Sequence, residues 1–288
     1  MSVTIAPFGP FRAALGECPR WDDGVLWLMD CRKGLILSLD GQGTPTVRAE
    51  VPAPAGSFAL RAAGGFVVAL KEEVALIGPD GSHRIVGRIS DSHANLRLND
   101  GVVLPDGSFL TGTMHVFREA GEPPLGGIFR LAPDLSLRKV APAVGVANWP
   151  CVGPDSRLYL ADSAARIIVS HAIGADGTLS DPRPFADLAP LDSAPDGCCF
   201  DDQGGLWTAL VHAGAVVRLD ADGQVTQRID LPVQHPAALC FGGEALDQMF
   251  VTSISDSGRL RADGPLDGAV LCVTGHGRRG LPARRFAG

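Results

Sequence analysis

The chain has 288 residues, of which 45% are hydrophobic and 20% are charged, and its formal net charge is −7. This composition excludes an extended disordered chain, and the size suits one closed all-β domain spanning residues 1–288. The acidic balance, without a stripe of Lys and Arg, disfavours nucleic acid and anionic membranes as partners.

The ends and the cysteines bear on the cellular setting. Residues 1–17 lack a basic region followed by a long apolar stretch, so we predict no signal peptide. No apolar run approaches the roughly 18 residues of a membrane span. The seven cysteines form no CxxC pairs at zinc-site spacing, which predicts a reduced, cytoplasmic protein with thiols buried as small hydrophobes.

Short apolar runs and tight turns alternate along the chain. Residues 3–6 are expected to form an outer strand that pairs with a C-terminal strand at 269–273. Asp-Gly dipeptides between apolar segments predict hairpin turns. They occur at residues 80–81, 106–107, 176–177 and 222–223, and the predicted strands include residues 25–29, 66–70, 166–170, 206–210 and 215–219.

One pattern recurs six times, at intervals of roughly 40 to 50 residues, and is typical of propeller blades. A polar residue starts an apolar run, and a Gly-rich turn leads to a second apolar run. The starts are Glu17, Ser57, Asn99, Asn148, Asp196 and His235. The repeat predicts an all-β, six-bladed β-propeller with four-stranded antiparallel blades, closed by pairing of N-terminal and C-terminal strands. Residues at this shared phase should gather near the axis of the propeller.

Three of these starts carry oxygen ligands. Glu17, Asn148 and Asp196 supply two carboxylates and one amide oxygen, which suit a single divalent ion: Ca²⁺, Mg²⁺, Mn²⁺, Fe²⁺ or Zn²⁺. Three ligands leave positions open for water and substrate. Taken singly, each residue also fits a turn, a bend or a surface acid.

Two further residues are candidates for substrate binding. Arg97 and Asn99 lie two residues apart, on one face of a predicted strand, where they could hold ligand oxygens. A salt bridge between blades is the alternative for Arg97. His235 is a candidate pocket residue, although a histidine before Pro236 also fits a structural or exposed role.

Several motifs together resemble the gluconolactonase, regucalcin and luciferin-regenerating enzyme family. They are GECPRWDDGVLWLMD, RLNDGVVLPDGSFLTGTM, PDGCCFDDQGGLWTALVHAGAVVRLDADG, PVQHPAALCFGGEALDQMFVTS and RGLPARRFAG, and they span nearly the whole chain. The resemblance implies a six-bladed propeller, a divalent metal on Glu17, Asn148 and Asp196, and substrate contacts from Arg97 and Asn99. It also implies hydrolysis of a small-molecule sugar lactone, with Asp196 as general base.

The chain departs from this family pattern at two places. Trp149 follows Asn148 where many relatives have glycine, and it either walls the pocket or packs between blades. Phe117 stands where relatives of the regucalcin type carry an acid, while His115, on the same loop, could compensate. We therefore keep open a less polar lactone or ester, a non-hydrolytic reaction, and a non-catalytic metal-binding propeller. The sequence leaves the oligomeric state open.

Overall fold

The computed structural model describes residues 2–115, 117–119 and 121–288. By its internal contacts the chain divides into two compact units. The first comprises residues up to Val51 together with Ala186–Ala283, and the second comprises Pro52–Phe185 and Arg284–Gly288. The single domain expected from the sequence stays a prediction.

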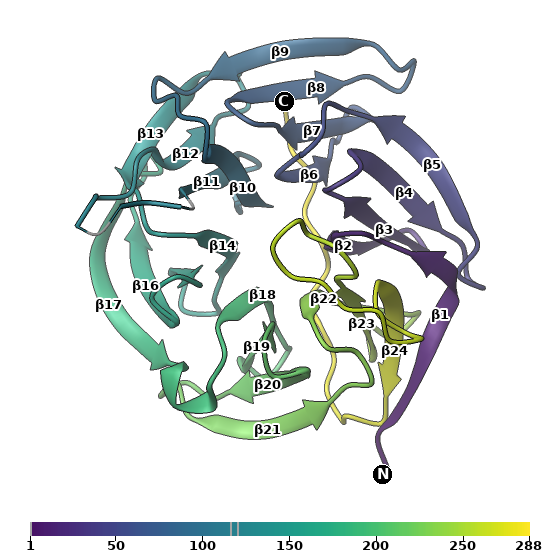
Figure 1. Cartoon of the computed structure of the whole chain (residues 1–288). Helices are drawn as coiled ribbons and strands as arrows, with labels where there is room; N and C mark the ends of the chain where they lie inside the picture. Colours follow the sequence, from purple (N-terminus) through teal and green to yellow (C-terminus); the bar gives the residue numbers. More distant parts are fainter. Residues whose placement is uncertain (1, 116, 120) are drawn as a thin grey trace. The chain divides into compact units, whose positions relative to one another are not determined.

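The first unit contains three four-stranded sheets, each a blade (Figure 1). One consists of β2 (Gly16–Asp22), β3 (Val25–Asp30), β4 (Leu35–Leu39) and β5 (Pro45–Glu50). Another consists of β18 (Pro195–Phe200), β19 (Leu206–Leu210), β20 (Ala215–Leu219) and β21 (Val225–Asp230). The third has the order β22 (Pro236–Gly242), β23 (Gln248–Ser253), β24 (Ala269–Thr274) and β1 (Thr4–Arg12). Strand β22 contacts both β2 and β18.

The second unit contains the other three blades. They are β6 (Ser57–Leu60), β7 (Phe66–Ala69), β8 (Glu73–Ile77) and β9 (His83–Arg88); β10 (Leu96–Val103), β11 (Phe109–His115), β12 (Gly127–Leu131) and β13 (Leu137–Pro142); and β14 (Ala147–Val152), β15 (Leu158–Asp162), β16 (Ile167–Ile173) and β17 (Leu179–Asp187). Strand β10 contacts both β6 and β14 (Figure 1).

The predicted fold class is confirmed: the protein is an all-β, six-bladed β-propeller with four-stranded antiparallel blades. The N-terminal strand completes the last blade as expected, with Thr4 opposite Thr274 in an antiparallel pair. The only helical segment among the described residues is a 3₁₀ turn, Ala189–Leu191. In that part of the chain, therefore, no helix has the length and apolar character that crossing a membrane requires.

Burial follows the strand order within a blade. All residues of β7, β19 and β20 are buried, as their near-continuous apolar sequences predict for strands covered on both faces. The fourth strands, such as β5 and β21, are polar and largely exposed. The Asp-Gly turns form as expected, and Gly107 and Gly223 adopt φ angles of 79° and 74°, which favour glycine.

The C-terminal residues pack into the second unit. Phe286 is fully buried in a cluster with Phe109, Leu131 and other apolar residues of that unit. Its N–H donates to the carbonyl of Leu60 at 2.8 Å, and its carbonyl accepts from the N–H of Ala62 at 2.8 Å. Phe286, in the last motif of the sequence, therefore has a structural role.

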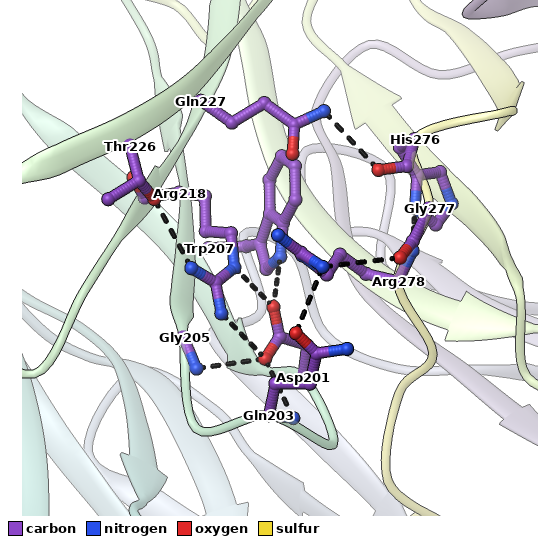
Figure 2. A network of polar contacts seen from close by, with 10 residues as sticks. All are labelled: Asp201, Gln203, Gly205, Trp207, Arg218, Thr226, Gln227, His276, Gly277 and Arg278. Atoms are coloured by element: carbon purple, nitrogen blue, oxygen red, sulfur yellow. Dashed lines mark hydrogen bonds and ion pairs between the residues drawn. The ribbon is translucent and has the colours of Figure 1, made fainter. Parts of the chain in front are cut away.

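A buried ion pair organises the blade β18–β21 (Figure 2). The carboxylate of Asp201 accepts from Arg218 Nε at 2.6 Å and from the indole of Trp207 at 2.9 Å. It also accepts from the backbone N–H groups of Gln203 and Gly205. Because all of these partners are donors, the buried charge is well compensated. Nothing in the sequence pattern alone indicated this network.

Candidate metal and substrate site

The two predicted carboxylate ligands lie close together in the first unit. Glu17 is on β2 and Asp196 on β18, and both are buried, with 8% and 7% of their surfaces exposed. Their carboxylate oxygens approach within 4.8 Å of each other. Two buried carboxylates at this distance repel, and a divalent cation between hard oxygen donors relieves that repulsion. The donor set therefore fits a hard divalent metal.

β-Bulges aim these side chains. In β2 the register shifts between Glu17 and Arg20, and in β18 it shifts between Pro195 and Cys198. A bulge places two residues opposite one and redirects a side chain out of the regular alternation. Cys18, directly after Glu17, has a φ of 55°, a conformation that costs a non-glycine residue of the order of 1–3 kcal/mol.

The predicted amide ligand belongs to a fixed chain of hydrogen bonds in the second unit. Nδ2 of Asn99 donates to the carbonyl of Ala147 at 2.9 Å and to Oδ1 of Asn148. Nδ2 of Asn148 in turn donates to Oγ of Ser163 at 2.7 Å. The Ala147 carbonyl can only accept, so it determines the orientation of both amides. One lone pair of Asn148 Oδ1 accepts from Asn99, which leaves the other for a cation.

The substrate candidates Arg97 and Asn99 both lie on β10, before and within its bulge between Leu98 and Gly101. Asn99 is buried, with 7% exposed, and Arg97 is half-buried. Nη1 of Arg97 donates to the carbonyl of Leu98 at 3.0 Å. Since both hydrogens of Asn99 Nδ2 are engaged, this side chain offers a ligand an acceptor, Oδ1.

Asp100 was missed as a functional candidate. Its side chain is buried, and Oδ2 accepts from the backbone N–H of Trp149 at 3.0 Å. Asp100 thereby holds the backbone of Trp149, the residue after Asn148. Trp149 has a strained φ of 23°. An acid directly after Asn99 was the sequence signal, but its place in the Asn-Asp-Gly run resembled an ordinary turn.

The position of His235 in the repeat needs a correction. Pro236 pairs with Ser253 as Pro195 pairs with Leu210, so Ala237, not His235, occupies the position equivalent to Asp196. The apolar and turn pattern of the sequence does not reveal this two-residue offset, which becomes visible only in the strand pairing. By the same register His235 corresponds to Arg97. It is 7% exposed, and its Nδ1–H donates to the carbonyl of Val211 at 2.8 Å.

The other candidate pocket residues differ in accessibility. Trp149 is only 5% exposed, so most of its indole serves packing. His115 is buried, its Nδ1 accepts from the N–H of Leu125 at 3.2 Å, and burial lowers its pKa. Phe117 lies just beyond β11 and is 68% exposed. Only Phe117 thus presents a large apolar surface.

A separate cavity of about 400 Å³ lies in the first unit beside the Asp201 network. It contains none of the predicted site residues. Its lining combines charges of both signs, from Asp202, Asp247, Arg278 and Arg279.

Comparison with known families agrees with these observations. Residues 15–255 match the model of the SMP-30/Gluconolactonase/LRE-like region. Regucalcin of Xenopus laevis is 33% identical over 286 residues, with 95% of each chain covered. A 6-deoxy-6-sulfogluconolactonase of Pseudomonas putida is 32% identical over 270 residues, with 91% of each chain covered.

A solved structure has the same fold. The calcium-binding protein regucalcin from Agrobacterium tumefaciens superposes with a TM-score of 0.86 at 23% identity, and the match covers 97% of this chain and 96% of that one.

Proposed function

Because the chain belongs to the SMP-30/gluconolactonase/LRE-like family, we propose that it is a divalent-metal-dependent lactonase that opens a sugar lactone to the aldonic acid. The observation that carries this proposal is the convergence of the buried carboxylates of Glu17 and Asp196 within 4.8 Å. Two such groups can stay ionised together when a cation shares them. The similarity to the Pseudomonas putida lactonase supports the substrate class.

Glu17 and Asp196 hold the metal in this proposal, and Asn148 is the third ligand predicted from the sequence. The identity of the metal is left to experiment, because oxygen ligands accept several ions; the regucalcin from Agrobacterium tumefaciens is described as calcium-binding. When bound, the cation polarises the lactone carbonyl and stabilises developing negative charge on its oxygen.

The protein residues supply proton transfer and orientation. Asp196 accepts a proton from the attacking water, whose oxygen bonds to the carbonyl carbon. The ring C–O bond then breaks, and the leaving alkoxide takes up the proton that Asp196 accepted, which returns Asp196 to its carboxylate form. Asn99 Oδ1 accepts a hydrogen bond from a substrate hydroxyl, and the Arg97 guanidinium donates to a substrate oxygen, so that binding energy serves positioning.

The test is hydrolysis of a panel of aldonolactones by chelated protein, with and without added Ca²⁺, Mn²⁺, Zn²⁺, Mg²⁺ or anaerobic Fe²⁺. Acid release is followed against a no-enzyme control for each lactone and metal, since these lactones also hydrolyse spontaneously. Turnover restored by a metal supports the proposal. A protein that binds a cation but hydrolyses no lactone or ester would instead be a non-catalytic binding propeller.

The exposed ring of Phe117 favours one alternative within the same reaction class. An aromatic ring cannot accept a sugar hydroxyl as a carboxylate does, but it can cover an apolar group. The second candidate substrate is therefore a less hydroxylated lactone or ester. Adding such compounds to the panel decides between the two, because the preferred class gives the higher kcat/KM.

A further inference from the structure

Two aspartates occupy the same place in two different blades. Asp30 is the last residue of β3 and pairs with Gly16, while Asp162 is the last residue of β15 and pairs with Ala147. Each pairing partner is the residue just before a predicted metal ligand, namely Glu17 or Asn148. Neither aspartate is among the residues predicted from the sequence to serve the site.

The carboxylate of Asp30 binds the segment that leads into β2. Oδ2 accepts from the N–H of Ala14 at 2.9 Å, and Oδ1 accepts from the N–H of Leu15 at 3.2 Å. Oδ1 also accepts from the N–H of Lys33 at 3.2 Å. The side chain is completely buried, so these bonds are shielded from water.

Asp162 repeats this arrangement ahead of β14. Oδ2 accepts from the N–H of Gly145 at 3.1 Å, and Oδ1 accepts from the N–H of Val146 at 3.1 Å. Oδ1 also accepts from the N–H of Ala164 at 3.1 Å, in the loop that follows. The two carboxylates thus bind the N–H groups two and three residues before a ligand, each through the same pair of atoms.

A backbone hydrogen bond closes each loop at the same point. The N–H of Cys31 donates to the carbonyl of Leu15 at 2.9 Å, and the N–H of Ser163 donates to the carbonyl of Val146 at 3.1 Å. The blades β18–β21 and β22–β1 contain this backbone bond as well, from Val211 and from Ile254. Their residues equivalent to Asp30, however, are Leu210 and Ser253. The backbone bond is therefore common to all four blades. The carboxylate occurs only in the blades of Glu17 and Asn148 among these four, and the blade of Asp196 has Leu210 in its place.

We propose that Asp30 and Asp162 are positioning residues that hold the segments before Glu17 and Asn148 in the register from which these ligands reach the cation. This proposal rests on the proposed metal function. Residues that orient a metal ligand without touching the metal typically contribute 10- to 100-fold to metal affinity. The carboxylates act through the backbone, so they need no contact with substrate or metal.

The matched control is Asp267. Its Oδ1 accepts from the N–H of Gln234 at 2.8 Å, three residues before Ala237, which occupies the ligand position without a ligating side chain. Oδ2 accepts from the N–H of Gly264 at 2.9 Å. Asp267→Asn therefore removes the same charge and the same kind of backbone contact, but from a blade without a predicted ligand.

The experiment measures the affinity of chelated full-length protein for Ca²⁺ and Mn²⁺ by calorimetry, together with backbone hydrogen exchange by mass spectrometry. We expect Asp30→Asn and Asp162→Asn to bind at least about 10-fold more weakly, and Asp267→Asn to stay within about twofold. Exchange should accelerate at residues 14–15 in the first variant and at residues 145–146 in the second.

Unchanged affinity in a folded Asp162→Asn protein, or an equal loss in Asp267→Asn, would overturn the proposal. If the completely buried Asp30 cannot be replaced without unfolding, the half-buried Asp162 decides the result. A wild-type protein that binds neither cation refutes the proposed metal function. In that case the exchange rates still report separately whether the carboxylates hold these segments.

Discussion

Asn99 donates a side-chain hydrogen bond to Oδ1 of Asn148, and this contact determines which atom of Asn148 is available as a ligand. The carbonyl of Ala147 can only accept a hydrogen bond, so it fixes the orientation of the Asn99 amide. The Asn148 amide is fixed in turn, because its Nδ2 donates to Oγ of Ser163. A substrate residue and a metal ligand predicted separately from the sequence are thus parts of one hydrogen-bond chain.

Removing the end of this chain should loosen the ligand. In Ser163→Ala, Nδ2 of Asn148 loses its partner, so the amide can rotate, and we expect metal affinity to fall about 10-fold. Ser163→Thr retains a hydroxyl and should restore most of the affinity. Calorimetric titration with Ca²⁺ or Mn²⁺ measures both. Ser170→Ala, in the same blade but bonded to Arg157, is the control, and an equal loss there would refute the role of Ser163.

Neutralising Glu17 or Asp196 should lower the activity and leave the fold intact. We expect Glu17→Gln and Asp196→Asn each to lower kcat/KM at least about 100-fold while circular dichroism stays unchanged. Because the two carboxylates repel without a cation, neither change should lower the Tm of chelated protein. Added metal should raise the Tm of wild type and have little effect on the variants. Near-wild-type turnover in either variant would refute the site.

The Asp201–Arg218 pair should contribute to stability at neutral pH. Burial alone would raise the pKa of Asp201, but hydrogen bonds from Arg218, Gly205 and Trp207 outweigh it and hold the pKa below its usual range. Arg218→Leu leaves that buried carboxylate without its cation, so we expect a loss of about 3–5 kcal/mol in the free energy of unfolding. Urea denaturation at pH 7 measures it.

The pH dependence follows from the direction of that shift. A lowered folded-state pKa stabilises the protein above the unfolded-state pKa of about 3.9, and this contribution disappears as the pH falls through the folded value. In Arg218→Leu, burial is no longer offset by the guanidinium, so the pKa of Asp201 is higher than in wild type. Protonation of Asp201 therefore relieves the variant first, and the difference in stability between wild type and Arg218→Leu should narrow as the pH falls from 7. As a control, Asp220→Asn, in the hairpin that follows β20, should cost less than about 1 kcal/mol.

Two partly buried cysteines, Cys199 on β18 and Cys240 on β22, should be chemically inert. Burial raises the pKa of the Cys240 thiol to about 12 and that of Cys199 well above its usual range. Since the thiolate is the reactive form, maleimide should label both slowly in native protein at pH 7 and rapidly after unfolding. Peptide mass spectrometry follows the labelling. Cys198→Ala should keep most of the activity, and a 100-fold loss would show that a thiol takes part.

Local sequence was enough to determine the blades. Predicted strands 206–210 and 215–219 coincide with β19 and β20, because continuous β-branched and aliphatic runs between Gly-containing turns have few other ways to bury their surface. The repeat also placed Glu17 and Asp196 at equivalent positions, because each copy of the repeat corresponds to one blade.

Only the tertiary structure showed how these side chains are aimed and supported. Strand pairing shows that Ala237, and not His235, occupies the ligand position, because the alternation of apolar runs and turns does not fix the phase of the repeat to the residue. Contacts such as those of Asp162 with Gly145 and of Asp100 with Trp149 join residues 17 and 49 positions apart. Hydrogen bonds of that range depend on strand pairing and blade packing, so they become visible only once the chain has folded.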